Sequence, residues 1–381
     1  MRLTAFVTVL SAVSILPVFL LSGLTVLMRV DVGADASTIG LAATAFFLTS
    51  SGAATFGGRL VDARGARQAA VRGLLLTGTA LLCIALLARS VLQIVLLLGI
   101  CGVANGVTQP ALNTSLAYGT APNRRGTAFG IKQSSIPGAT LVVGAAVPGL
   151  SAGIGWRMGF ISGAGLSLLA AVLVRYLPDD GHDAAADDGP TTRSVEIGTA
   201  LRWLAVAGML GAAGSLSVSA FFIEWGVIVG MSPARAGVLL SLGSLGAIGS
   251  RVLAGVFVDR GRGSLTPVMG GLLLIGGVGT LMPVLPFPAA QLAGVLLALS
   301  VGAGWTGLYF VIALQYSTAS RGRAMGLAQA AAAGGGVFGP LLVGLLATSA
   351  GFVSAWLLVA AFFLISFLAL ARSRSHWVSG R

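Results

Sequence analysis

Long apolar segments follow one another along most of this chain, separated by short polar turns. Each segment has about 20 residues or more, the length that an α-helix needs to cross the hydrocarbon core of a bilayer. A transmembrane β-barrel would instead alternate apolar and polar positions over segments of about ten residues. The pattern predicts twelve membrane-spanning helices, at about residues 5–28, 37–59, 69–88, 91–118, 126–152, 156–176, 201–225, 234–258, 265–285, 289–317, 322–348 and 352–371. The expected fold class is therefore an all-α membrane protein.

The longest polar segment lies in the middle of the chain and divides the twelve predicted helices into two groups of six. Residues Pro178–Thr199 are rich in Asp, Ala, Gly and Pro, which is typical of a solvated linker. We expect an N-terminal six-helix bundle at residues 1–176, a linker at 177–200, and a C-terminal six-helix bundle with a short tail at 201–381.

The distribution of charged residues adds a prediction of how the protein is oriented in the membrane. The chain is 9% charged with a net charge of +12, whereas a soluble domain carries about 25% charged residues. The basic residues lie in short loops between spans, so a lipid bilayer is the expected partner and nucleic acid is not. Nineteen of the 23 fall on one side and four, Arg29, Arg89, Arg157 and Arg235, on the other. The excess predicts a protein of the cell (inner) membrane with both termini and the linker in the cytoplasm.

Several kinds of chemistry have no residues to support them. The two cysteines and two histidines form no metal-binding or disulfide pattern. No Gly-Lys-Ser/Thr loop for nucleotide phosphates is present, which argues against ATP-driven pumping. The first apolar segment is too long for the core of a cleavable signal peptide. We therefore expect a protein that is not an enzyme and has no cofactor or metal.

One polar turn, Gly58–Arg67, carries an aspartate where a helix should end. The C-terminus of a helix bears partial negative charge, so Asp62 is disfavoured there unless another group binds it. Gly65 provides the turn, and Arg67 follows it.

A second copy of this pattern shows that the chain is duplicated. Gly58 and Gly255, and Asp62 and Asp259, are each 197 positions apart. Three further landmarks recur at an offset of 196: Gly126 with Gly322, Gly130 with Gly326, and Gln133 with Gln329. So constant an offset indicates two copies of one structural unit.

The duplicated turn resembles the signature loop of the major facilitator superfamily, G-x-L-x-D-x-x-G-x-[RK]. Gly58, Leu60, Asp62, Gly65 and Arg67 match it, while Ala63 stands where an arginine is usual. The resemblance covers about residues 5–371. It implies twelve helices in two pseudo-symmetric six-helix bundles, a small-molecule substrate, alternating access and a monomeric protein.

The repeat also predicts what each aspartate contacts. We expect Asp62 to face the start of the predicted helix at 322–348, near Arg321, Gly322 and Arg323. A helix N-terminus and an arginine would both stabilise the carboxylate, and the contact would gate the cytoplasmic side. The alternative is a solvated loop acid worth less than about 1 kcal/mol.

Its counterpart Asp259, followed by Arg260, should face Arg124, Arg125 and Gly126 in the same way.

Two charges on the opposite side predict an external gate. Arg29 ends the first predicted helix, and Glu224 lies near the outer end of the seventh, within two positions of pseudo-equivalence. In the resembled family these helices approach each other near the axis. Two alternatives remain open: Glu224 as a proton carrier, or a simple interfacial charge.

Polar side chains in the fourth predicted helix form a stripe. Asn105, Gln109 and Asn113 recur every four residues and so share one face. The repeat relates Gln109 to Trp305 and Asn113 to Tyr309 in the tenth helix, and the resemblance implies that both helices line a central cavity. We interpret these residues as a substrate-binding surface; the alternative is interhelical hydrogen bonding without a ligand.

Lys132, the only lysine, lies six residues after Gly126 and next to Gln133. Its pseudo-equivalent is alanine, whereas Gln133 recurs as Gln329. A lysine within a span is costly, at about 2.5–3.5 kcal/mol on insertion scales. We therefore predict that Lys132 is the counter-ion of a negatively charged substrate; the alternative is that it snorkels to the cytoplasmic surface.

The function predicted from these patterns is secondary transport of a small organic anion. One alternative is proton-coupled drug or metabolite efflux, although Leu98 stands about where such exporters carry an arginine. A sugar–proton symporter fits less well, because the first, fourth and tenth predicted spans contain no carboxylate. A further alternative is a non-transporting membrane sensor or scaffold.

Overall fold

The computed structural model describes residues 1–34, 36–139, 141, 143, 155–177, 198–317 and 320–379. Every regular element in these ranges is an α-helix or a short 3-10 helix. Ten helices there are long and apolar enough to cross a membrane. The last of them covers two predicted spans, which are separated by a kink at Gly351, where φ is 80° and ψ is 168°. The predicted all-α fold class is confirmed.

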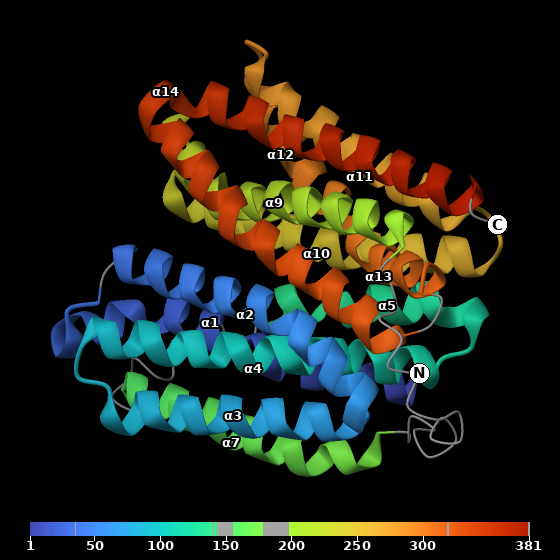
Figure 1. Ribbon diagram of the computed structural model, residues 1–381. Helices are drawn as coiled ribbons and strands as arrows, with labels where there is room; N and C mark the ends of the chain where they lie inside the picture. Colours follow the sequence, from blue (N-terminus) through green and yellow to red (C-terminus); the bar gives the residue numbers. More distant parts are fainter. Residues whose placement is uncertain are drawn as a thin grey trace. The chain divides into compact units, whose positions relative to one another are not determined.

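The helices form two compact units (Figure 1). The first contains the described residues of Met1–Gly119, Ser135–Glu196 and Ala319–Ala330, and the second those of Thr120–Ser134, Ile197–Thr318 and Ala331–Arg381. Each unit therefore includes one short segment from the other half of the sequence. Most of the linker predicted at 177–200, namely residues 178–197, lies outside the described residues.

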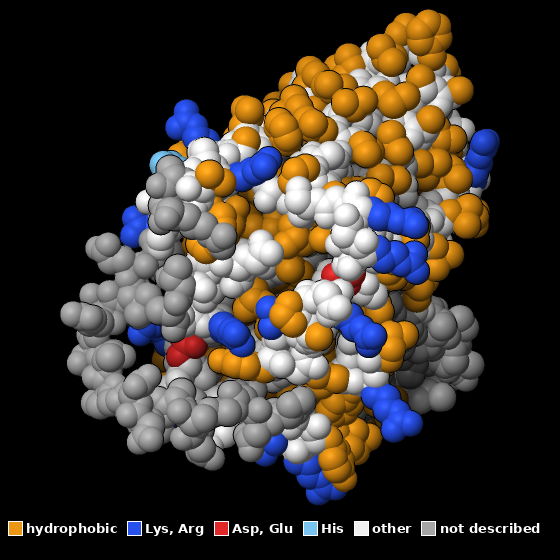
Figure 2. All heavy atoms as spheres, turned by 90° about the vertical axis from the view of Figure 1, so that its right-hand side faces the viewer, with side chains coloured by type: hydrophobic (Ala, Val, Ile, Leu, Met, Phe, Trp, Pro, Cys, Tyr) orange, Lys and Arg blue, Asp and Glu red, His pale blue; other side chains and the backbone are white. Residues whose placement is uncertain are grey.

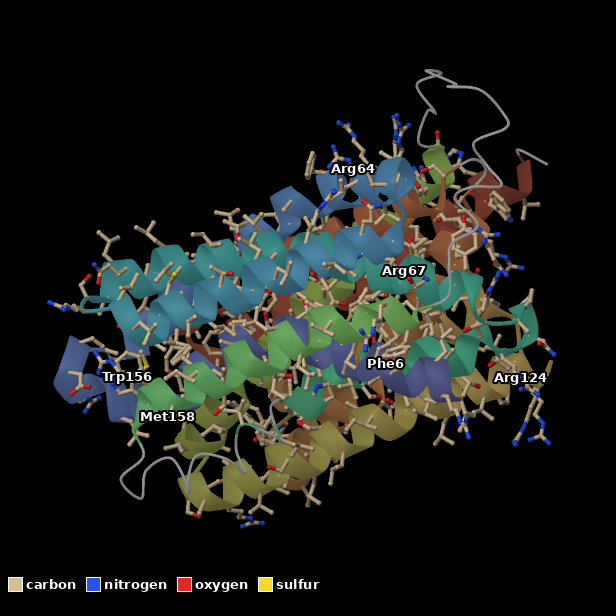
Figure 3. The ribbon with its side chains drawn as sticks, turned by 90° about the horizontal axis from the view of Figure 1, so that it is seen from below. Phe6, Arg64, Arg67, Arg124, Trp156 and Met158 are labelled. Carbon is tan, nitrogen blue, oxygen red and sulfur yellow. The ribbon has the colours of Figure 1, made fainter. Side chains whose placement is uncertain are left out.

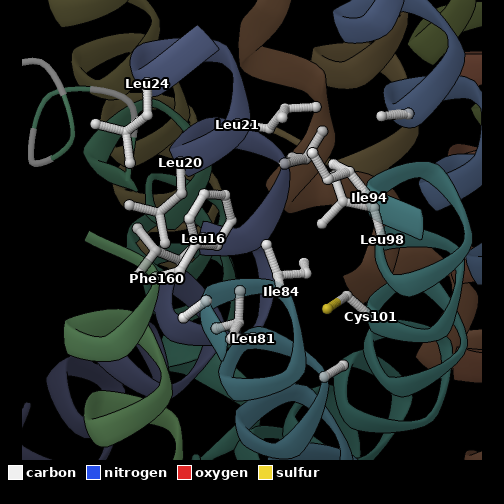
Figure 4. Packing of buried hydrophobic residues seen from close by; sticks show 14 of the residues in the cluster. Leu16, Leu20, Leu21, Leu24, Leu81, Ile84, Ile94, Leu98, Cys101 and Phe160 are labelled. Carbon is white, nitrogen blue, oxygen red and sulfur yellow. The ribbon is translucent and has the colours of Figure 1, made fainter. Parts of the chain in front are cut away.

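The first unit is built mainly from five long helices. They are α1 (Arg2–Val32), α2 (Ala36–Arg64), α3 (Ala66–Leu87), α4 (Val91–Tyr118) and α7 (Trp156–Leu173), together with the start of α14 (Arg321–Ser379). Leu16, Leu20 and Leu24 recur every four residues and so lie on one face of α1. Figure 4 shows this face beside residues of α3 and α7, including Leu81 and Phe160.

Glycines set how closely α2 and α4 approach each other. A Cβ atom added at Gly57 would lie 2.6 Å from the carbonyl oxygen of Gly106. One added at Gly106 would lie 2.5 Å from that of Ser50. Lipid offers little hydrophobic drive for helix association, so such close backbone packing stabilises the pair.

The second unit contains one short helix from the first half of the sequence and the helices of the second half. Its elements are α5 (Arg125–Gln133), α9 (Thr199–Ile228), α10 (Pro233–Asp259), α11 (Leu265–Leu281), α12 (Pro288–Ser300), the 3-10 helix η5 (Gly302–Trp305), α13 (Thr306–Gln315) and the rest of α14. The predicted span at 126–152 is described only in part: after a turn at Ser134 the chain is helical again at 135–139.

The tenth predicted span, at 289–317, is not one continuous α-helix. It divides into α12, η5 and α13, with the tighter 3-10 turn at Gly302–Trp305. A Cβ atom at Gly302 would lie 2.6 Å from the Cα of Gly276 in α11. The break therefore lies where the backbones of two helices almost touch, a contact that periodicity alone does not reveal.

The last helix also continues beyond its predicted end at residue 371. Helix α14 runs to Ser379, and three contacts within the second unit stabilise this extension. The rings of Trp377 and Tyr316 lie 4.7 Å apart. The guanidinium of Arg372 lies over Trp203, and the Ser373 hydroxyl donates to the Ala200 carbonyl oxygen at 2.6 Å.

Candidate functional site

Asp62 lies in the last turn of α2 and is bound by the start of α14. Its Oδ1 accepts the backbone N–H of Gly322 at 2.9 Å, and its Oδ2 accepts that of Arg323 at 3.0 Å. The Ser320 hydroxyl donates to Oδ2 as well, and Arg323 Nε lies 3.9 Å from Oδ2. The carboxylate is thus disfavoured by its own helix and stabilised by the N-terminus of another. The contact is the one that the repeat predicts.

The second unit contains the same arrangement. Asp259, the last residue of α10, accepts the backbone N–H groups of Gly126 at 2.9 Å and Thr127 at 2.7 Å. Glycine is required at the donor because a Cβ atom on Gly126 would lie 2.8 Å from the carboxylate. This contact, too, is present as predicted.

The glycines and arginines of the two loops take several different roles. Gly65 turns the chain between α2 and α3 with φ 81°. Arg67 Nη2 donates to the Leu177 carbonyl oxygen at 2.9 Å. Arg321 lies over the Tyr118 ring at 4.4 Å, and Arg125 Nε donates to the Thr120 carbonyl oxygen at 3.2 Å.

Figure 3 shows Arg64 and Arg67 where α2 meets α3, far along the first unit from Trp156. On the face drawn in Figure 2, several basic side chains are visible beside very few acidic ones. Arg124 and Arg260 lie beside the second loop, in η1 (Pro122–Arg124) and directly after α10.

Only some of the amides in the polar stripe of α4 are hydrogen-bonded to side chains of other helices. Asn105 Nδ2 donates to Ser50 Oγ at 2.9 Å, and Ser14 Oγ donates to Asn105 Oδ1 at 3.0 Å. Ser11 Oγ donates to Gln109 Oε1 at 2.9 Å. These two amides therefore make the interhelical hydrogen bonds of the alternative interpretation.

Asn113 differs from its neighbours in the stripe. It is 0% exposed, and neither its Oδ1 nor its Nδ2 has a hydrogen-bond partner among the described residues. A buried amide without partners is costly, so its retention needs an explanation.

Lys132 is buried in the second unit, with 1% of its surface exposed. Its Nζ donates to Gln133 Oε1 at 3.2 Å and lies 5.7 Å from the centre of the Phe310 ring. The alternative in which the side chain snorkels to the cytoplasmic surface is therefore wrong. Aromatic packing and a neutral amide hold the ammonium group inside the protein.

Arg251 is a buried cation that the sequence reasoning assigned to the cytoplasmic surface. It lies within α10 and is 8% exposed. Its Nε donates to the Ala303 carbonyl oxygen at 3.2 Å, and its Nη1 to that of Gln133 at 3.3 Å. Its position in the middle of an apolar span was the signal that could have identified it. Neither Arg251 nor Lys132 belongs among the loop charges that predict orientation.

The aromatic residues predicted from the repeat lie close together in the second unit. Trp305 Nε1 donates to Ser215 Oγ at 3.0 Å, and its ring meets that of Tyr309 edge-on at 5.5 Å. Both side chains are fully buried. Gln329, the counterpart of Gln133, lies half-buried in the part of α14 that belongs to the first unit.

The two charges of the predicted external gate are both exposed. Arg29 lies in the last turn of α1 and Glu224 in α9. They belong to different units, and their pairing stays a prediction.

A charged contact that the sequence reasoning missed lies at the same end of α1. Asp31 Oδ2 accepts Trp156 Nε1 at 2.8 Å and Arg157 Nη1 at 2.9 Å. The indole N–H, and to a lesser degree the guanidinium, hold the pKa of Asp31 below its ordinary value. Sequence periodicity gave no signal for a contact between residues so far apart.

Comparison with known proteins identifies the class to which this fold belongs. The model of the Major Facilitator Superfamily matches residues 5–293 and, in an overlapping second match, residues 204–376. The chain therefore belongs to the major facilitator superfamily and is a multi-pass membrane transporter. None of the curated protein sequences matches it. Within the described residues no group of side chains could hold a metal ion.

Solved structures share the fold over nearly the whole chain. The human organic anion transporter MFSD10 is 17% identical, with a TM-score of 0.79 over 97% of this chain and 99% of that one. The E. coli fucose:proton symporter FucP is 15% identical, with a TM-score of 0.76 over 97% and 98% of the two chains. The proton:xylose symporter XylE is 16% identical, with a TM-score of 0.80 over 97% and 94%. At this identity the likeness shows the fold alone.

Proposed function

We propose that this protein is a secondary transporter that moves a small organic anion across the inner membrane by alternating access. The observation that carries the proposal is the burial of Lys132, which is 1% exposed and lies in the span predicted from the sequence at 126–152. Charged side chains in such regions are expensive and usually mark a substrate or ion pathway. A cation there favours a substrate with a carboxylate or a similar negative group.

The two aspartate contacts support the alternating part of the mechanism. Asp62 and Asp259 each join the end of one helix to the start of a helix from the other half of the sequence. Breaking both contacts would free the two sequence copies on the side of the signature loops. We propose that these contacts gate that side, with Arg67, Arg321 and Arg323 supporting them.

The amide of Asn113 is the best candidate for a polar contact to the substrate. It is buried and has no partner among the described residues, whereas Asn105 and Gln109 bind serines of other helices. A ligand oxygen or a water molecule would satisfy it.

Proton-coupled drug efflux is less well supported. Leu98, which stands about where drug exporters carry an arginine, is fully buried in the apolar core of the first unit. Of the three structures named above, one is an organic anion transporter and two are proton symporters. An anion carried together with protons is therefore our proposal for coupling, and a monomer is the proposed functional state.

Counterflow in proteoliposomes tests the proposal. Purified protein is reconstituted with an internal pool of one organic anion, and entry of the same radiolabelled anion is measured across a panel of carboxylates. We expect concentrative exchange for at least one anion, with Lys132→Gln at least ten-fold slower than wild type and Lys132→Arg retaining part of the rate. The matched control is Arg72→Gln, which removes an exposed arginine of α3 that binds only Gln68 in the described structure.

If Lys132→Gln exchanges the anion as fast as wild type, the lysine is only an anchor and the anionic substrate loses its main support. An ohmic current in place of exchange would indicate a channel.

A further inference from the structure

The end of α14 is docked on the start of α9 in the second unit. The buried Ser373 hydroxyl donates to the Ala200 carbonyl oxygen at 2.6 Å. One residue further back, the guanidinium of Arg372 lies 5.9 Å from the centre of the Trp203 ring. Figure 1 shows both helix ends at the same end of this unit. The two contacts connect the extension of α14, which lies beyond its apolar span, to a second helix.

Three exposed arginines lie beside this junction. Arg372 and Arg374 are the chain neighbours of Ser373. Arg202 directly precedes Trp203 in α9. None of the three arginines forms an ion pair with a residue that the structure describes. Positive charge from two helices is therefore gathered at one exposed junction.

The carboxylates described in the second unit do not neutralise this charge. They belong to Glu224 and Asp259. Glu224 lies 22 residues after Arg202 (224 − 202) on the same helix, which is a rise of about 33 Å. Asp259 accepts the backbone N–H groups of Gly126 and Thr127. A negative partner for the arginines must therefore come from outside the described part of this unit.

Arg372 continues an exposed apolar stripe of α14. Leu364, Ile365 and Leu368 are 37%, 49% and 59% exposed along this span. Arg372 follows Leu368 by four residues, so it lies on the same face, about 6 Å further along the helix axis. Large apolar side chains exposed along a membrane span contact lipid tails, and the headgroup region begins directly beyond the hydrocarbon core. The guanidinium therefore lies at the depth of the lipid headgroups.

The first unit has a pseudo-equivalent helix end with a different arrangement. Gly155 and Gly351, with φ of 84° and 80°, each precede the last span of one half of the sequence. Arg175 follows the first of these glycines by 20 residues, and Arg372 follows the second by 21. Arg175 lies over the ring of its neighbour Tyr176 at 4.9 Å and donates to the hydroxyl of that ring at 3.0 Å. Its guanidinium is thus bound at its own helix end and provides a matched position for comparison.

We propose that Arg202, Arg372 and Arg374 form a binding site for the phosphate group of an anionic phospholipid of the surrounding bilayer. Arginine presents a planar fork of donors that suits phosphate oxygens. Clusters of basic residues directly beyond a membrane span attract anionic lipid headgroups, and tryptophan is enriched at the same depth. The bound phosphate bridges the ends of α9 and α14 and so stabilises the second unit. This partner is independent of the transported solute.

Native mass spectrometry of the delipidated full-length protein tests the site. The protein is titrated in detergent with phosphatidylglycerol or with phosphatidylcholine of the same acyl chains, and the bound lipids are counted. We expect phosphatidylglycerol to occupy at least one site ten-fold or more tightly than phosphatidylcholine. It should also raise the unfolding temperature, because a ligand that binds the folded state stabilises it. Added salt should weaken the preference, since the site is exposed.

Variants connect this preference to the three arginines. The double variant Arg202→Gln with Arg372→Gln should bind phosphatidylglycerol at least ten-fold more weakly and lose the rise in unfolding temperature. Arg372→Lys keeps the charge without the fork and should retain part of the preference. Arg175→Gln is the matched control: it removes the same charge from the pseudo-equivalent helix end and should bind as wild type. If the double variant is unfolded, Arg374→Gln provides the same test with one charge removed.

Three outcomes would overturn the proposal. A folded double variant that binds phosphatidylglycerol as tightly as wild type shows that the arginines are not the site. Equal binding of phosphatidylcholine shows that only the acyl chains are recognised. Equal stabilisation by inorganic phosphate at the same concentration indicates a general anion site in place of a lipid headgroup site. Because no transported anion enters these measurements, they are independent of the proposed function.

The other possible occupant is the acidic linker of the same chain. Its first part contains five aspartates, Asp179, Asp180, Asp183, Asp187 and Asp188. Replacing all five by asparagine should leave the unfolding temperature of the delipidated protein unchanged if the site belongs to lipid. If the replacement destabilises the wild-type protein but not the double arginine variant, the linker occupies the arginines and the lipid assignment is wrong.

Discussion

At the scale of single residues, the two signature aspartates illustrate how a locally unfavourable charge is explained by a distant partner. Asp62 and Asp259 each end a helix whose own dipole disfavours them. Each is bound by two backbone N–H groups at the start of another helix, at 2.7–3.0 Å. Ser320 adds a hydroxyl at Asp62 and also accepts the Arg323 backbone N–H at 3.2 Å, as a helix N-cap does.

Replacing this carboxylate by an amide should weaken the contact without changing its shape. An amide cannot accept from all of these donors with both of its polar atoms, and a hydrogen bond to a charged group contributes about 1.5–3 kcal/mol. We expect Asp62→Asn to lower the unfolding temperature and to reduce anion exchange at least ten-fold. Differential scanning fluorimetry and counterflow measure the two effects.

Ser320→Ala is the matched control, because it removes one donor and leaves the charge and both backbone bonds. It should have a smaller effect on both measurements. Unchanged exchange and an unchanged balance of inward- and outward-facing states in Asp62→Asn would show that the loop does not act as a gate.

The amides of α4 permit a comparison between a structural and a functional residue on one helix. Asn105 binds two serines, whereas Asn113 is fully buried without a partner among the described residues. We expect Asn105→Leu to destabilise the protein by about 1–3 kcal/mol, because it leaves serine hydroxyls unpaired. Asn113→Leu should be neutral or stabilising, since it removes an unpaired buried amide.

Transport should show the reverse order: Asn113→Leu should lose exchange despite its stability. Unfolding temperature and counterflow, measured on both variants, check this prediction. A stable Asn113→Leu that transports normally would mean that Asn113 does not contact the substrate.

At the scale of helices, glycine positions decide which elements can pack. Gly52 and Gly58 lie on the same helix, α2. A Cβ atom at Gly58 would collide with the Gly322 carbonyl oxygen of α14, whereas one at Gly52 meets nothing within 4 Å. The same helix thus has one glycine that the packing requires and one that it does not.

This contrast yields a prediction with its own control. Gly58→Ala should push α14 away from α2, lower the unfolding temperature and disturb the Asp62 contact one turn further along. Gly52→Ala should be neutral or stabilising by up to about 1 kcal/mol, because alanine favours helix more than glycine. Equal behaviour of the two variants in fluorimetry and counterflow would contradict the packing argument.

The break between α12 and α13 is also bound by a side chain of a neighbouring helix. The carbonyl oxygen of Ala303, within the 3-10 turn, accepts Arg251 Nε at 3.2 Å. That of Gln133, at the end of α5, accepts Nη1 of the same arginine at 3.3 Å. Carbonyl groups at helix ends lack partners in their own helix and favour a cation. One buried arginine therefore supports two helix ends.

At the scale of the whole molecule, the sequence predicts how the protein is oriented in the membrane. Even without Lys132 and Arg251, seventeen basic residues against four favour cytoplasmic termini. Cysteine labelling of intact cells with an impermeant maleimide checks this. With Cys83 and Cys101 replaced by alanine, Phe287→Cys, exposed between α11 and α12, should react. Ser375→Cys, exposed near the end of α14, should react only after the membrane is permeabilised.

Labelling of Ser375→Cys in intact cells would show that the orientation is opposite to the predicted one. The signature loops would then lie on the outer side of the membrane.

Apolar segment length, the two-fold repeat and the misplaced aspartates could all be interpreted from the sequence alone. Span length is set by bilayer thickness, and a repeat offset needs no knowledge of the fold. The contacts of Asp62 and Asp259 were predictable because a carboxylate at a helix C-terminus demands one particular kind of partner. Gly65 was predictable as a turn because glycine adopts positive φ without steric cost, and its φ in the structure is 81°.

Only the tertiary structure decided which polar side chains bind one another. Whether Asn105, Gln109 or Asn113 has a partner depends on serines of other helices, at distances that periodicity does not encode. The break at η5, the extension of α14 to Ser379 and the burial of Arg251 likewise depend on close contacts between elements distant in sequence. Local pattern sets which segments are helices, and packing determines where each charge lies, because burial is a property of neighbours.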